Sequence, residues 1–143
     1  MRLTSDQLEQ YVKPVIESQT EPTLEPIDAD HLIGAWKAMM DAGTGVAYGS
    51  DAGFLLGLHC MDLMTGKRKG FEYLWMTFPH KRAGGEAMKL LVEFEDGAKF
   101  DGCVAIVVGN SSGYRPEALG RLYRRVGYVK ISEGFQKQLR KDG

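Results

Sequence analysis

The chain has 143 residues, of which 43% are apolar and 26% are charged, and its formal net charge is -1. These values are typical of one globular domain that is long enough to bury a core. They argue against a general nucleic-acid binder, which carries a marked excess of positive charge, and against a membrane-spanning protein, because no apolar run approaches about 20 residues. The two cysteines and three histidines lie far apart in the sequence, so we expect no metal site. The N-terminus lacks the apolar core of a signal peptide, which favours a cytoplasmic protein.

The first part of the chain predicts two helices. One is expected from about Ser5 to Ser18, where apolar residues recur at helical spacing. A loop that contains two prolines follows. Asp28 or Asp30 then begins a second helix, which we expect to end before Gly43.

The pattern changes to strands from residue 46 onward. We expect strands at 46–48, 54–61 and 71–77, with turns at 50–53 and 65–67. A helix is expected after residue 84, because five apolar residues follow at helical spacing: Ala87, Leu90, Leu91, Phe94 and Ala98. The run 103–108 is nearly all apolar, as in a strand that is buried on both faces. A helix from Pro116 to Gly127 and a closing hairpin at 128–131 and 135–139 complete the predicted order.

The segment between the third strand and the third helix, Pro79 to Ala87, is the most informative part of the sequence. A strand that turns through a glycine loop into a helix directs unpaired backbone N–H groups into the turn, and the helix dipole adds partial positive charge there. The adjacent glycines Gly84 and Gly85 allow a bulky anion to approach the backbone. We therefore predict an anion site, with pyrophosphate as its guest.

Two motifs in this order resemble the signatures of GNAT-type N-acetyltransferases. Arg82-Ala83-Gly84-Gly85-Glu86-Ala87 is similar to their Arg/Gln-x-x-Gly-x-Gly/Ala loop, with Ala87 in place of the last glycine. The later segment with Leu122, Tyr123, Gly127 and Tyr128 resembles their Leu-Tyr-x-x-x-Gly-Phe element. The hairpin at 53–57 and Asn110 also match features of the family. The resemblance covers about residues 45 to 139, and only a vestigial first strand is seen at 1–3.

The resemblance implies one α/β domain over residues 1–143. Its central sheet would be mixed and mostly antiparallel, flanked by helices, with one pair of strands splayed apart. Residues 1–43 would supply helices on the acceptor side, and residues 44–143 would form the core that binds acyl-CoA.

The resemblance also implies that acetyl-CoA is the co-substrate. The pyrophosphate would bind the glycine loop, and the pantetheine arm would fill the gap between the splayed strands. A backbone N–H of the strand before the loop would then stabilise the oxyanion of a tetrahedral intermediate. The residues expected to bind acetyl-CoA are Met76, Thr77, Phe78, Arg82, Ala83, Gly84, Gly85, Glu86, Ala87 and Asn110.

Transfer of an acetyl group to a primary amine requires an acid and a base. Tyr123 matches the family's tyrosine and is the candidate acid for the leaving thiolate. Glu72 is the one carboxylate in its apolar strand and is the candidate base, with Asp62, His59 and Tyr73 in reserve. Strict alternation places Glu72 on the face of Leu74 and Met76, unless a bulge at the splay point changes the face.

Two other interpretations remain open from the sequence. The first is a GNAT-like fold that serves as a non-catalytic binding or assembly module. Glu86 favours it, because it brings a negative charge into the loop that would bind pyrophosphate. Trp36, Met39 and Met40 also favour it, because they are candidates for an exposed partner surface. A nucleotide-binding P-loop is disfavoured, because the loop lacks the Gly-Lys-Ser/Thr ending. The acceptor amine belongs to a small molecule or a protein, and the resemblance is compatible with a homodimer.

Overall fold

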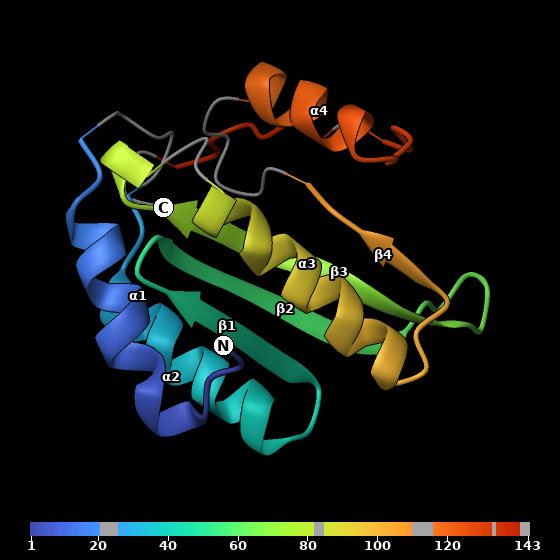
Figure 1. The fold of residues 1–143 in the computed structure, drawn as a ribbon, viewed down its shortest axis with the longest axis horizontal. Helices are drawn as coiled ribbons and strands as arrows, with labels where there is room; N and C mark the ends of the chain where they lie inside the picture. The colour runs from blue at the N-terminus through green and yellow to red at the C-terminus, as the bar shows by residue number, and fades with distance from the viewer. Residues whose placement is uncertain (21–25, 82–84, 110–115, 133, 141–143) are drawn as a thin grey trace.

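A four-stranded sheet in the order β1-β2-β3-β4 forms the centre of the protein (Figure 1). The computed structural model describes residues 1–20, 26–81, 85–109, 116–132 and 134–140. The antiparallel neighbours are β1 (Gly45–Ser50), β2 (Gly53–Met61) and β3 (Arg68–Thr77). The last strand, β4 (Ala105–Val107), runs parallel to β3. The expectation of a mixed, mostly antiparallel sheet flanked by helices is therefore confirmed.

Helices cover both faces of this sheet. The N-terminal elements are the short 3₁₀ helix η1 (Ser5–Gln7), α1 (Leu8–Glu17) and α2 (Ala29–Asp41). The later elements are η2 (Pro79–Lys81), α3 (Gly85–Phe100) and α4 (Pro116–Arg125). The predicted start of α2 is confirmed, because the Asp28 side chain accepts a hydrogen bond from the His31 N–H at 3.0 Å. Among the helices of the described residues, none has the length and apolar character needed to cross a bilayer.

Alternate residues of the sheet belong to two separate apolar cores. Ala47 packs with α1 and α2, whereas its neighbours Val46 and Tyr48 pack with α3 on the opposite face. The five apolar positions predicted for α3 are all buried, and Phe94 is fully enclosed. Phe94 lies so close to β2 that a Cβ at Gly57 would overlap its ring. This face of the sheet and α3 are therefore in direct contact around Phe94.

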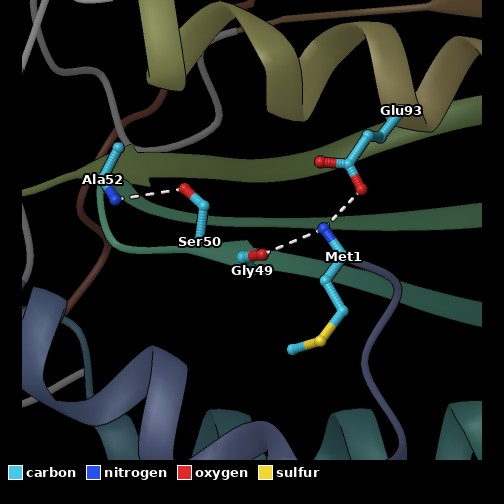
Figure 2. Close-up of polar contacts among 5 residues, drawn as sticks. All are labelled: Met1, Gly49, Ser50, Ala52 and Glu93. Carbon is cyan, nitrogen blue, oxygen red and sulfur yellow. Dashed lines mark hydrogen bonds and ion pairs between the residues drawn. The ribbon is translucent and has the colours of Figure 1, made fainter.

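The first three residues bridge β1 to α3. The Leu3 N–H donates to the Ala47 carbonyl oxygen at 2.8 Å, and Arg2 forms an isolated antiparallel bridge with Tyr48. Figure 2 shows the Met1 amine between the Gly49 carbonyl oxygen and the Glu93 carboxylate of α3. The vestigial first strand is thus present as a single bridge at this edge of the sheet.

The predicted C-terminal half of the sheet is only partly present. The strand β4 has three residues rather than six, and it is not buried on both faces, because Ala105 is exposed and Val104 is 64% exposed. No strand forms among the described residues after α4, so the predicted closing hairpin is wrong for them. Phe135 is 93% exposed and contributes nothing to a core there. A segment with a strand-like sequence forms a strand only where a neighbouring strand hydrogen-bonds to it. Among these residues β4 has one such neighbour, β3, so it forms the edge of the sheet.

The proposed partner surface on α2 also requires correction. Trp36 is only 4% exposed, and its indole N–H donates to the Val46 carbonyl oxygen at 3.0 Å. Met39 and Met40 are half-buried. These side chains hold α2 on the sheet, because the apolar stripe of an amphipathic helix packs against the core.

Candidate active site

A β-bulge in β3 determines which side chains face α3. The register shifts by one residue between neighbouring pairs: Leu56 lies opposite Leu74, whereas Gly57 lies opposite Glu72. Tyr73 is the additional residue of β3 at this point. Its ring lies 5.1 Å from that of Trp36, so Tyr73 is on the side of α2.

The bulge moves Glu72 to the face that α3 covers. Gly57 faces α3, because a Cβ there would overlap Phe94, and cross-strand partners point to the same face. Glu72 therefore lies on the same face as Trp75, whose cross-strand partner is Leu55. The expectation from strict alternation, which grouped Glu72 with Leu74 and Met76, is wrong for this physical reason.

The strands β3 and β4 separate directly after Phe71, so Glu72 is the first residue of β3 that has no partner in β4. Their pairing ends at Phe71 and Val107, while β3 continues for six residues to Thr77. The Glu72 carboxylate accepts a hydrogen bond from the Gly109 N–H at 3.1 Å. Since Gly109 follows β4, this bond links the two strands at the point where they diverge.

Glu72 is a buried carboxylate that holds its proton more tightly than an exposed glutamate does. The residue is only 8% exposed. Burial raises the pKa of Glu72 from its ordinary value of 4.5 to about 7, and the hydrogen bond from Gly109 opposes part of this rise. A carboxylate with this pKa can take up and release a proton near neutral pH, as a general base must.

Tyr123 of α4 binds the backbone of the same residue, Gly109, through the carbonyl group. Its hydroxyl donates to the Gly109 carbonyl oxygen at 3.2 Å, and the residue is 8% exposed. Burial and the negative charge of Glu72 raise the pKa of the Tyr123 hydroxyl well above its ordinary value of 10. Tyr123 is therefore a neutral phenol that can donate a proton or a hydrogen bond. Both candidate catalytic residues thus meet at Gly109, a residue that the sequence did not single out.

The C-terminal end of β3 presents backbone groups to the gap left by β4. The Phe78 N–H donates to the Ala52 carbonyl oxygen at 2.8 Å, so it is directed towards β2. In an antiparallel ladder the backbone groups alternate in direction, so those of Met76 also face β2, and those of Trp75 and Thr77 face away from it. The Thr77 carbonyl oxygen accepts from the Gln19 side chain at 2.9 Å.

The described part of the glycine loop is the beginning of α3. Gly85 opens the helix and Ala87 is buried against the core. Glu86 is exposed and forms an ion pair with Lys89, with its Oε1 2.8 Å from the Lys89 Nζ. This pair lowers the pKa of Glu86 and offsets its negative charge beside the helix N-terminus. Arg82, Ala83, Gly84 and Asn110 lie outside the described residues.

The three reserve bases lie elsewhere. His59 is 1% exposed, and its Nδ1 lies 2.6 Å from Asp101 Oδ2, near the C-terminal end of α3. Asp62 forms an ion pair with Lys69 at the turn between β2 and β3. Tyr73 faces α2. In the described residues, no cluster of three or more His, Cys, Asp or Glu side chains is arranged to hold a metal ion.

An open groove of about 1120 Å³ borders β4. It is lined by β4, the C-terminal half of α3, α4 and the segment that follows α4, and it reaches Tyr123 and Gly109. Glu72 and Trp75 are not among its lining residues. The groove therefore does not border Glu72, although Gly109, whose N–H binds the Glu72 carboxylate, is one of its lining residues.

No model of a known protein family matches the chain, and no curated protein has a significantly similar sequence. Solved structures with the same fold are nevertheless numerous. The aminoglycoside N-acetyltransferase AAC(6')-Iy, in complex with CoA, has a TM-score of 0.73 and 14% identity over 97% of this chain and 92% of that chain. A GNAT family acetyltransferase from Staphylococcus aureus has a TM-score of 0.64 and 17% identity over 97% and 96%. A transcriptional regulator from Bacillus halodurans has a TM-score of 0.71 and 20% identity over 97% of each chain.

These similarities establish that the chain has the GNAT fold, over nearly its whole length. At such identities they are evidence of the fold alone. The function must be argued from the site.

Proposed function

We propose that the protein is an acetyl-CoA-dependent N-acetyltransferase that acetylates a primary amine. The observation that carries the proposal is that Glu72 and Tyr123 both bind the backbone of Gly109, Glu72 through its N–H and Tyr123 through its carbonyl oxygen, where β3 and β4 separate. A group that accepts a proton near neutral pH and a group that donates one are the two that this reaction needs. The proposal is consistent with the fold, which AAC(6')-Iy in its CoA complex shares.

The described residues fit acetyl-CoA in three respects. The N-terminus of α3 provides a site for the pyrophosphate, and Lys89 offsets the charge of Glu86 beside it. The backbone groups of Trp75 and the N–H of Thr77 face away from β2, on the side where β4 has left the sheet and where an extended chain of amide groups would lie, whereas the Thr77 carbonyl oxygen is bound by Gln19. A buried indole N–H of Trp75 lacks a partner in the described residues. Acetyl-CoA would supply an acetyl group activated as a thioester.

Except for the backbone amides of Met76 and Phe78, the residues predicted from the sequence keep their roles in this proposal. The loop residues Arg82, Ala83, Gly84, Gly85, Glu86 and Ala87 bind the pyrophosphate, and Asn110 is a further residue proposed to bind acetyl-CoA. Within the strand, the N–H of Thr77 is the donor for the developing oxyanion, because the amides of Met76 and Phe78 face β2. The N-terminal helices, within residues 1–43, lie on the side that binds the acceptor amine.

Glu72 accepts a proton from the substrate ammonium, directly or through a water molecule, and the neutral amine that results attacks the thioester. Because the pKa of Glu72 is about 7, the carboxylate is partly ionised at neutral pH. Tyr123 then donates its hydroxyl proton to the departing thiolate, and its oxygen takes up the second proton that the acetylated nitrogen must lose. To do so the hydroxyl must give up its hydrogen bond to the Gly109 carbonyl oxygen.

Two measurements test the proposal. Titration calorimetry should detect acetyl-CoA binding, and the absence of any heat at about 100 µM ligand would refute the proposal. Release of free thiol from acetyl-CoA should then be followed over a panel of primary amines that includes aminoglycosides and peptides. The activity should rise with pH through about 7, as Glu72 ionises, and Glu72→Gln should abolish this rise.

Two observations reduce the support for the alternative of a non-catalytic module. Trp36 is buried rather than available to a partner. The charge of Glu86 is offset by Lys89 rather than isolated in the loop. The acetyltransferase is therefore the function that we propose.

A further inference from the structure

The described residues contain three buried side-chain polar atoms without a hydrogen-bond partner: Tyr48 Oη, His59 Nε2 and Trp75 Nε1. An indole N–H is a donor only, so a buried one without an acceptor is unfavourable, and most such groups in folded proteins are satisfied. Trp36, the other tryptophan, is satisfied by the Val46 carbonyl oxygen. The unsatisfied donor of Trp75 therefore requires an explanation.

Trp75 differs from the other two residues in its position. The rings of Tyr48 and His59 lie 6.3 Å and 5.8 Å from that of Phe94, in the middle of the core between the sheet and α3. Trp75 lies on β3 beyond the point where β4 leaves the sheet, and its ring is 6.3 Å from that of Tyr123. Among these three orphaned groups, only that of Trp75 borders the proposed active site.

The position of Trp75 also matches the path of the ligand. The bulge places Trp75 on the face of Glu72, three residues further along β3. The indole packs on the apolar cluster that includes Leu90, Leu91 and Met88 from the first turns of α3, where the proposed pyrophosphate site begins. It therefore lies between the proposed pyrophosphate site and the pair of Glu72 and Tyr123. An arm that joins a pyrophosphate to a thioester at Tyr123 must pass this side chain.

We propose that the indole N–H of Trp75 donates a hydrogen bond to an amide carbonyl oxygen of the pantetheine arm. The assignment rests on the proposed function, since it requires that acetyl-CoA binds in the gap. Trp75 is then a binding residue for the acyl donor, and the bulge at Tyr73 has two effects. It turns Glu72 towards the reaction and keeps Trp75 on the same face.

Trp75→Phe tests the assignment, because it keeps an aromatic ring and removes the donor. Calorimetry should show that this substitution weakens CoA binding by about tenfold, as expected for one lost hydrogen bond. Binding of adenosine 3',5'-bisphosphate, which has no pantetheine arm, should be unchanged. The matched control is Tyr48→Phe, which removes another unsatisfied buried donor far from the arm and should leave both affinities unchanged.

A second measurement uses the unmodified protein. Its two tryptophans give two indole N–H cross-peaks in a ¹⁵N–¹H spectrum, and Trp36→Phe or Trp75→Phe assigns them. CoA should move the Trp75 cross-peak downfield and leave that of Trp36 in place, whereas adenosine 3',5'-bisphosphate should move neither.

The outcomes separate the two proposals. If the wild-type protein does not bind CoA, the proposed function fails and the assignment of Trp75 fails with it. If CoA binds but Trp75→Phe retains full affinity, or the Trp75 cross-peak is unmoved, only the assignment is overturned. Equal weakening of CoA and adenosine 3',5'-bisphosphate binding would likewise overturn it, because a contact with the arm affects only the ligand that has one.

Discussion

Replacement of Glu72 by glutamine should make the protein more stable at neutral and alkaline pH, although it removes a proposed catalytic residue. The amide oxygen of the new side chain can still accept from the Gly109 N–H, and the volume of the side chain is nearly unchanged. What the substitution removes is the cost of ionising a buried carboxylate. The residue is 8% exposed, so solvent screens this cost very little.

The magnitude follows from the pKa. Because the folded-state pKa is about 7 and the ordinary value is 4.5, the folded state holds its proton more tightly than the unfolded state does. The stabilising effect of this proton is complete below pH 4.5 and is lost as the pH rises to about 7. At 1.36 kcal/mol for each pKa unit, the loss amounts to about 3 kcal/mol. The free energy of unfolding of Glu72→Gln, minus that of the wild type, should therefore grow by about 3 kcal/mol between about pH 4 and pH 8.

Urea unfolding at several pH values over this range measures this difference directly. Glu86→Gln is the matched control, because Lys89 lowers the pKa of this exposed carboxylate and the expected pH dependence has the opposite sign. A constant difference between Glu72→Gln and the wild type over this range would falsify the assignment of Glu72 as a buried carboxylate with a raised pKa. The proposed base would then have to be sought elsewhere.

Three further predictions concern single contacts. Tyr123→Phe should lower the turnover number of acetyl transfer by about 100-fold without changing CoA affinity in calorimetry, since it removes only the proton donor. Gly57→Ala should lower the free energy of unfolding by about 1–3 kcal/mol, because its Cβ overlaps Phe94, whereas Gly34→Ala in α2 meets no atom within 4 Å and should be stabilising. Asp28→Ala should cost about 1 kcal/mol through loss of the α2 cap.

Each of these predictions has an outcome that contradicts it. If Tyr123→Phe retained the full turnover number, Tyr123 would not be the proton donor to the departing thiolate. Equal stability of Gly57→Ala and Gly34→Ala would be incompatible with close contact between β2 and Phe94. Asp28→Asn, which keeps an oxygen acceptor, should restore most of the loss in Asp28→Ala, and a failure to do so would contradict the capping role.

Local patterns in the sequence predict much of the fold correctly. The apolar stripe of α3 is set by the 3.6-residue period of a helix, and all five of its predicted members are buried. The cap at Asp28 depends on one side chain and the amide three residues later, and it is present. The paired motifs around Gly85 and Tyr123 indicate the GNAT fold, which solved structures share over nearly the whole chain. These features depend on neighbours in the sequence, so the sequence alone predicts them.

The errors arise where a residue depends on partners that are distant in sequence. The run 103–108 is apolar, but β4 is short and half-exposed, because among the described residues it pairs only with β3. The sequence suggests an exposed Trp36, but its indole N–H donates to β1 and its ring contacts Tyr73. Whether a residue is buried, and whether a strand is paired, depends on the element that packs against it in the fold. A local sequence pattern does not identify that element.

The sequence by itself determined that this chain contains Glu72 in a strand, Tyr123 in a helix and a glycine loop between them. Only the tertiary structure decided that Glu72 and Tyr123 meet at Gly109, because that contact joins three segments separated in sequence by 37 and 14 residues. The physical reason is the bulge in β3. One additional residue reverses the side-chain alternation and turns Glu72 towards α3. A register shift of this kind depends on the pairing of β2 with β3, so no periodicity within β3 could have revealed it.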